Sequence, residues 1–141
     1  MPSKAISKLT IYSDGGARGN PGPAAIGVLI CSENGDMLED HCETIGETTN
    51  NVAEYTAVIV GLEMARKFGA REIHYFVDSE LVARQLSGRY RVKTPHILNL
   101  YKQVKEKEKL FTSVVFTQVP RTHEKLRYVD KLVNQALDME A

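Results

Sequence analysis

The hydrophobic periodicity of this chain changes once, near residue 48, and that change constrains the possible folds more than any other feature. Before this point, three segments alternate apolar and polar side chains as half-buried strands do, and they cover residues 8–13, 24–32 and 37–45. An Asn34-Gly35 pair between the last two segments is a strong signal for a two-residue hairpin. Strands joined by such a turn must run antiparallel.

Beyond the TTNN cluster (48–51), which is typical of a helix N-cap, the pattern becomes that of helices alternating with strands. The predicted helices cover 52–69, 80–87, 95–111 and 126–140, and the predicted strands cover 71–77 and 113–119. Strands that are joined through helices pair in parallel. The sequence therefore predicts an α/β fold in which a mixed sheet carries helices on its faces.

The length and composition are those of a single globular domain, expected to span residues 1–141. Apolar residues make up 43% of the chain and charged residues 26%, which is ordinary for a globular protein. No apolar run approaches the length of a membrane span, and the first eight residues lack a signal-peptide core. We therefore expect a cytoplasmic protein that does not associate with membranes.

The two cysteines, Cys31 and Cys42, flank the predicted hairpin but are too far apart to pair. At roughly 3.3 Å per residue they are separated by ~13 Å along the sheet. A disulfide needs Cα atoms within ~7 Å. Both are expected to be free thiols in a reducing compartment.

The charge is zero overall but unevenly distributed. Residues 33–54 contain seven acids and no Lys or Arg, whereas residues 81–110 contain eight Lys or Arg and two Glu. The zero net charge argues against a nucleic-acid partner, and the basic half argues for one, because only the local field meets a phosphate backbone. Charge alone leaves open whether each block is simply a solvated face.

Four acidic residues occupy unusual positions in the predicted elements. Asp14 and Asp78 each follow a predicted strand, at the sheet edge where open α/β folds bind ligands. Glu54 shares the sheet-facing stripe of its helix with Val58, and Asp130 occupies a similar position in the last helix. Any one of these acids has an ordinary structural explanation, but together they suit Mg²⁺ or Mn²⁺, and two such ions would form a phosphoryl-transfer centre.

Four stretches of the chain together resemble type 1 ribonuclease H, in the short form found in bacteria and archaea. They are YSDGGARGNPGPAAIG (12–27), TTNNVAEYTAVIVGLEMA (48–65), FVDSELVARQL (76–86) and VPRTHEKLRYVDKLVNQAL (119–137). The resemblance implies a five-stranded sheet in the order 3-2-1-4-5, with its first three strands antiparallel. It also implies an endonuclease that hydrolyses the RNA strand of RNA/DNA hybrids and leaves 5′-phosphate and 3′-hydroxyl ends.

The resemblance also implies which residues carry the chemistry. Asp14, Glu54, Asp78 and Asp130 would bind two Mg²⁺ ions, for which Mn²⁺ could substitute, and Asp14 would bridge them. No side-chain nucleophile is needed, because a metal-activated water attacks phosphorus. His123 would be a mobile histidine that assists proton transfer or product release.

Further residues match the part of the family that contacts the hybrid. Asn20, Asn50 and Asn51 would contact the minor groove, where RNA displays its 2′-hydroxyls. Thr49 together with Asn51 would hold a phosphate of the DNA strand. Glu54 would also accept a hydrogen bond from a 2′-hydroxyl. The remaining candidate nucleic-acid contacts are Arg18, Glu80 and Arg121.

The sequence departs from the family pattern around the histidine and in its basic segment. Glu124 replaces an Asn, Val129 replaces an Ala, and two extra residues separate His123 from Asp130. Residues 89–96 are too short for the basic handle helix of longer members. Hybrid affinity would then depend on residues 90–93 and the Lys-rich segment 102–109, although Tyr90 is equally compatible with packing.

Two alternatives remain to the stand-alone enzyme. One is a binding module for hybrids or double-stranded RNA that keeps the fold without catalysis, although such a module would be expected to lose a carboxylate. The other is a domain of a larger polypeptide, as in a reverse transcriptase. Because the chain has no linker at either end, we expect a monomer that needs no protein partner.

Overall fold

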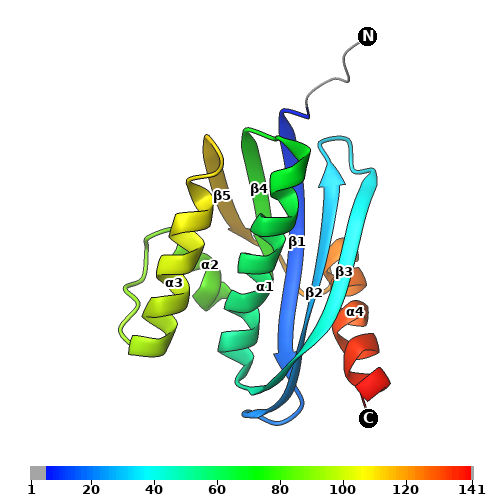
Figure 1. The fold of residues 1–141 in the computed structure, drawn as a ribbon, viewed down its shortest axis with the longest axis vertical. Coiled ribbons are helices and arrows are strands. Elements are labelled where there is room, and N and C mark those ends of the chain that lie inside the picture. The colour runs from blue at the N-terminus through cyan, green and yellow to red at the C-terminus, as the bar shows by residue number, and fades with distance from the viewer. Residues whose placement is uncertain (1–5, 141) are drawn as a thin grey trace.

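A five-stranded sheet in the order β3-β2-β1-β4-β5 runs through the molecule in this computed structural model, which describes residues 6–140 (Figure 1). The strands are β1 (Lys8–Ala17), β2 (Gly22–Ser32), β3 (Met37–Thr48), β4 (Glu72–Val77) and β5 (Ser113–Gln118). β1, β2 and β3 pair antiparallel, while β1 with β4 and β4 with β5 pair parallel. The predicted strand order and mixed sheet are confirmed.

Helices cover both faces of this sheet (Figure 1). They are α1 (Asn50–Ala65), α2 (Glu80–Leu86), α3 (Pro95–Glu108) and α4 (Glu124–Glu140), with a short 3₁₀ turn η1 (Arg66–Phe68). The first three helices share one hydrophobic core with the sheet, and α4 packs alone against the opposite face. The helix-bearing second half of the sequence therefore supplies both outer layers.

Helix α1 follows the predicted amphipathic pattern. Val58, Leu62 and Ala65 are fully buried against the sheet. The helical path continues through η1 and ends at Gly69, whose φ of +68° is readily adopted by a residue without a Cβ atom. The predicted end of this helix is confirmed, although its last turn is 3₁₀ rather than α.

Strand β1 is longer than the sequence pattern predicts. Asp14 pairs with Gly27 inside the antiparallel ladder, so it does not end the strand, and pairing continues to Ala17. Half of the predicted GGARGNPG loop is therefore strand, and the turn is confined to residues 18–21. Small residues mask the strand signal in the sequence, because Gly has low strand propensity outside a specific packing context.

The close approach of α1 to β1 explains why glycine stands at position 15. A Cβ atom built on Gly15 would lie 2.2 Å from the backbone oxygen of Ala53. The absence of a side chain brings the first turn of α1 directly onto the strand, beside Asp14.

The hairpin between β2 and β3 is confirmed, but its loop is longer than the predicted two residues. The Ser32 N–H donates to the Asp36 oxygen at 2.8 Å and the Gly35 N–H to the Ser32 oxygen at 2.9 Å, so residues 33–35 form the loop. A two-residue turn would place Cys31 opposite Leu38, whereas Cys31 pairs with Met37. Cys42 lies opposite Gly27, and both cysteines are free thiols, as predicted. Among residues 6–140, no helix is long and apolar enough to cross a membrane.

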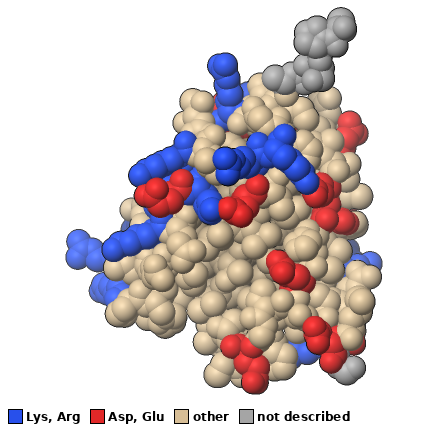
Figure 2. All heavy atoms as spheres, viewed as in Figure 1, with Lys and Arg blue, Asp and Glu red and all other residues tan. Residues whose placement is uncertain are grey.

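Basic side chains gather on the helical face over the C-terminal ends of α1 and α3, where acidic side chains lie among them (Figure 2). Lys107 pairs with Glu63, Lys105 with Glu108 at 2.9 Å, and Lys109 with Glu106 at 3.0 Å. This end of α3 lies away from the carboxyl ends of β1 and β4 (Figure 1). The Lys-rich half of α3 is therefore a solvated and largely self-neutralised face.

Candidate active site

Three carboxylates meet where β1 and β4 run side by side. Asp14 belongs to β1, Glu54 to the second turn of α1, and Asp78 directly follows β4. One oxygen from each lies within 4.8 Å of the others. Parallel pairing of β1 with β4 brings the two aspartates together, and the approach of α1 at Gly15 adds the glutamate.

The local structure of α1 fixes Glu54. Thr49 caps the helix, and its Oγ1 accepts a hydrogen bond from the Val52 backbone N–H at 3.2 Å. Glu54 is 7% exposed and accepts a hydrogen bond from the Gly15 N–H at 3.4 Å. Helix-dipole complementarity does not explain why this carboxylate is buried, because an exposed acid near the helix N-terminus would gain the same interaction.

The electrostatics of the three-carboxylate cluster disfavour full ionisation. Burial raises the pKa of Asp14 to about 6; the neighbouring Glu54 lowers it, and the charges of Asp78 and Asp130 raise it further. Burial, followed by the charge of Asp14, raises the pKa of Glu54 well above its usual range. Desolvation and like charges both favour the protonated form unless a cation compensates for them.

Two oxygens in this cluster have no hydrogen-bond partner among the described residues. They are Oδ1 of Asp14 and Oε2 of Glu54, and both are shielded from solvent. A buried carboxylate oxygen without a partner is costly, so such groups are usually paired or coordinate a metal. The donor set, made only of carboxylate oxygens, fits a hard divalent cation such as Mg²⁺ or Mn²⁺.

Asp130 lies near the cluster but is not part of it. It projects from α4 and lines the same cavity of about 730 Å³ as the other three acids. It is absent from the set whose oxygens lie within 4.8 Å of one another. The structure thus places all four predicted acids around one cavity, with three of them clustered and Asp130 outside the cluster.

Arg121 forms an ion pair with one carboxylate of the cluster. Its Nε donates a hydrogen bond to Asp78 Oδ2 at 2.9 Å, and its side chain is 72% exposed. Arg121 also lines the cavity. It therefore contacts a carboxylate of the cluster, whereas the sequence predicted a contact with nucleic acid.

An amide-rich rim continues the cavity beyond the carboxylates. Asn20, Asn50 and Asn51 all line it. The Asn20 side-chain oxygen accepts a hydrogen bond from the Asn50 N–H at 3.0 Å, and the Asn50 side-chain oxygen accepts one from the Ala17 N–H at 2.8 Å. These bonds join the turn after β1 to the start of α1 and connect Asn20 with Asn50, and Asn51 lines the cavity beside them.

Two other predicted contacts lie outside the lining of this cavity. Thr49 is engaged as the N-cap of α1, and Glu80 forms an ion pair with Arg84 at 3.3 Å one helical turn away. Neither arrangement tests a role toward a ligand that the structure does not contain.

His123 is not brought together with the carboxylates. Its ring lies against Tyr12 with a centroid separation of 5.4 Å, and its Nδ1 accepts a hydrogen bond from the Lys125 N–H at 3.1 Å. His123 does not line the cavity. His123 directly precedes α4, on the face of the sheet opposite α1. A role in the reaction would therefore require movement of this loop.

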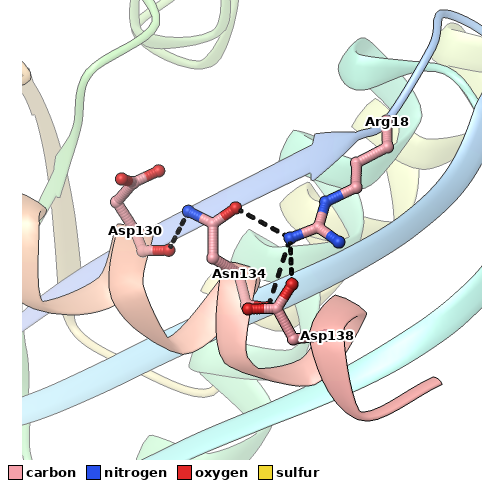
Figure 3. Close-up of polar contacts among 4 residues, drawn as sticks. All are labelled: Arg18, Asp130, Asn134 and Asp138. Atoms are coloured by element: carbon pink, nitrogen blue, oxygen red, sulfur yellow. Dashed lines mark hydrogen bonds and ion pairs between the residues drawn. The ribbon is translucent and has the colours of Figure 1, made fainter. Parts of the chain in front are cut away.

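Sequence reasoning missed a part of the cavity wall that α4 supplies. Asn134 and Leu137 line the cavity together with Asp130 and Val133. Figure 3 shows Asn134 one turn beyond Asp130, with Arg18 reaching across from the turn after β1. The spacing of four residues between Asp130 and Asn134 was the available signal, because such residues lie on one helix face.

Comparison with known proteins places this geometry in a family. The family model for reverse transcriptase-like proteins matches residues 12–136. Ribonuclease HI of Halobacterium salinarum is 43% identical over 134 residues, which cover 93% of this chain and 65% of that protein. A bifunctional protein of Mycobacterium tuberculosis is 42% identical over 135 residues, which cover 95% of this chain and 36% of that protein. The chain therefore spans about a third to two thirds of these curated relatives.

A solved structure gives the same result. LC11-RNase H1, determined in complex with an RNA/DNA hybrid, superposes with a TM-score of 0.88 and is 43% identical. The match covers 94% of this chain and 98% of that one.

Proposed function

This chain belongs to the type 1 ribonuclease H family, and from that membership we propose that it hydrolyses the RNA strand of RNA/DNA hybrids. The products would carry 5′-phosphate and 3′-hydroxyl ends. The observation that carries the proposal is the cluster of Asp14, Glu54 and Asp78, with two buried oxygens lacking partners. Without a cation, such a cluster can avoid its desolvated charge only by retaining protons.

Asp14, Glu54, Asp78 and Asp130 would hold two divalent ions, Mg²⁺ or in its place Mn²⁺. When bound, the ions would lower the pKa of the attacking water and stabilise the leaving 3′-oxygen. The carboxylates themselves supply negative charge in a partly desolvated site, which favours cations over neutral ligands. A bridging role for Asp14 is supported by its central position, because Glu54, Asp78 and Asp130 each influence the pKa of its carboxyl group.

The amide rim supports recognition of the hybrid. Asn20, Asn50 and Asn51 present groups that both donate and accept hydrogen bonds, as contacts with bases and 2′-hydroxyls in a wide minor groove require. Glu54 would accept a hydrogen bond from a 2′-hydroxyl, which would select RNA over DNA. The hydrogen bonds of the Asn20 and Asn50 side chains lower the cost of ordering these two residues on binding.

Charged residues at the mouth of the cavity complete the proposed interface. Arg121 would exchange its bond with Asp78 for a backbone phosphate, and Glu80 would lie beside the scissile strand. Thr49 with Asn51 would hold a phosphate of the DNA strand at the N-terminus of α1, where the helix dipole favours an anion. His123 would assist proton transfer or product release after its loop moves from Tyr12.

We further propose that residues 1–141 act as one domain and as a monomer without an obligate protein partner. The two free thiols, of which Cys31 is buried, favour the reducing environment of the cytoplasm. Both core layers are built from this chain, so folding would not depend on a second polypeptide.

The decisive experiment is cleavage of a hybrid whose RNA and DNA strands carry different end labels, in Mg²⁺ and in Mn²⁺. We expect cuts in the RNA strand only, and loss of cleavage in Asp14→Asn while its circular dichroism spectrum matches the wild type. A folded wild type that binds the hybrid without cutting it in either metal would instead indicate a non-catalytic binding module. Absence of both binding and cleavage would contradict the proposal.

A further inference from the structure

Arg18 connects two walls of the cavity that are far apart in the sequence (Figure 3). Its Nη2 donates to Asp138 Oδ1 at 2.6 Å and to the side-chain oxygen of Asn134 at 3.4 Å. The Asn134 amide nitrogen in turn donates to the backbone oxygen of Asp130 at 3.1 Å. The turn after β1 is thereby joined to the helix that carries the fourth acid of the cavity.

The same turn is fixed on its other side by α1. Asn20 accepts a hydrogen bond from Asn50, and Arg18 closes the turn by donating its backbone N–H to Pro23 at 2.8 Å. The turn that carries Asn20 is thus held on both sides. Asn20 itself is bonded to α1, and Arg18, two residues earlier, is bonded to α4. Loss of either contact would leave this side chain less well ordered at the rim of the cavity.

We propose that Arg18, Asn134 and Asp138 form a brace that positions the turn of Asn20 against α4, and that Arg18 therefore acts as a positioning residue rather than a phosphate contact. The inference rests on the proposed function, because the turn matters through its contact with the hybrid. It replaces the simpler expectation that an exposed arginine beside the cavity binds the nucleic-acid backbone.

Electrostatics favours the brace over the phosphate contact. Asp138 neutralises the guanidinium through a short, charge-assisted hydrogen bond, and an arginine bound in this way attracts phosphate less strongly. An ion pair this exposed, with side chains 44% and 68% accessible, contributes little to global stability. Its consequence should therefore appear in local order and hybrid affinity rather than in the melting temperature.

A double-mutant cycle separates the two roles. Arg18→Met and Asp138→Ala are compared singly and together, each in an Asp14→Asn background that binds the hybrid without cleaving it. For a brace, both single variants weaken binding by about two- to five-fold, and the double variant is no weaker than either. For a phosphate contact, Asp138→Ala would free Arg18 and tighten binding, which would overturn the proposal.

Salt dependence provides a second criterion. Removal of a phosphate contact lowers the slope of log affinity against log salt by about one, whereas loss of a brace leaves that slope unchanged. Glu140→Gln is the matched control, because it removes an acid from the same end of α4 whose partner is Thr44 rather than Arg18. A slope reduced by about one in Arg18→Met alone would contradict the brace.

Amide hydrogen exchange tests the brace without reference to the hybrid. The Arg18 and Asn50 N–H groups, which are bonded to Pro23 and Asn20, should exchange faster in both single variants and at wild-type rates in Glu140→Gln. If the parent protein bound no hybrid, the proposed function would fail, and these exchange rates would still decide the brace. Unchanged rates in both single variants would overturn it.

Discussion

At the scale of single residues, the site depends on acids placed where they cannot all be charged. Asp14 is 3% exposed and Glu54 7% exposed. Burial raises the pKa of both carboxyl groups, and the charge of Asp14 raises that of Glu54 further. The family fold tolerates this arrangement because a divalent cation would restore the balance. In the metal-free protein the same groups should oppose folding near neutral pH.

The substitution Asp14→Asn should therefore stabilise the metal-free protein, and more so as the pH rises. Burial raises the pKa of Asp14 from 3.8 to about 6, so in this window the folded protein retains a proton that the unfolded chain has released. Wild-type stability falls as the pH rises through that window, and the variant avoids the loss. We expect its advantage to grow by up to about 3 kcal/mol between about pH 4 and pH 7.

Urea unfolding in EDTA across this pH range measures the difference directly. Saturating Mg²⁺ at neutral pH should stabilise the wild type more than the variant, since the variant lacks one ligand. A stability difference that stays constant with pH would contradict the raised pKa.

Gly15 is required by backbone packing rather than by chain flexibility. A methyl group at this position would meet the backbone oxygen of Ala53 at 2.2 Å, and neither backbone can move without displacing Glu54. We expect Gly15→Ala to lower the free energy of unfolding by about 1–3 kcal/mol or more, as measured by urea denaturation. Gly16→Ala is the matched control, because its nearest neighbour would lie 3.9 Å away, and equal losses in both variants would contradict this explanation.

At the scale of secondary-structure elements, the helix termini place the functional groups. The N-terminus of α1 carries its cap, the amide rim and Glu54 within two turns. Helix α4 places Asp130 and Asn134 in the wall of the cavity. One turn further on, its Asp138 contacts Arg18 in the turn after β1. The sheet holds these two helices on opposite faces, and residues of both helices line the cavity.

Thr49→Ala should show two separable effects because this residue is an N-cap in the structure and a proposed phosphate contact. Loss of the cap should cost about 1 kcal/mol of stability. Ser79→Ala, which removes the corresponding cap of α2, should cost a similar amount. Thr49→Ala should also raise KM for the hybrid, whereas Thr49→Ser should preserve both stability and KM. An unchanged KM in a folded Thr49→Ala variant would limit Thr49 to capping.

At the scale of the whole molecule, two cores share one sheet. The larger core lies between the sheet and α1, α2 and α3, and the smaller one lies under α4. Leu29 and Ile30 are adjacent in β2 but face different layers, so the two cores are coupled through every strand they share. We infer that neither layer unfolds without the other.

A cooperative monomer is the corresponding expectation. The protein should elute in size-exclusion chromatography near its mass of 15.7 kDa and unfold in one transition by both far-ultraviolet circular dichroism and tyrosine fluorescence. Non-coincident transitions would show that the layer under α4 folds independently. Elution as a dimer at micromolar concentration would contradict the monomer.

The local patterns of the sequence determined the elements and their kinds. The change of period near residue 48, the hairpin at Asn34-Gly35 and a helix cap within the TTNN cluster (48–51) depend on neighbours in the chain, and the structure confirms each of them. The stripe that places Glu54 beside Val58 on the buried face of α1 was equally readable, because helical periodicity is local.

Only the tertiary structure decided which side chains meet. It placed Asp14 within a strand, left Asp130 outside the cluster of the other three acids, and docked His123 on Tyr12. The brace joins Arg18 to Asp138 across 120 positions of the chain. Such contacts depend on how the layers pack and how closely α1 approaches β1, and no local pattern encodes those distances. The sequence alone therefore determined the elements and the candidate acids, and packing decided the geometry that could make them a site.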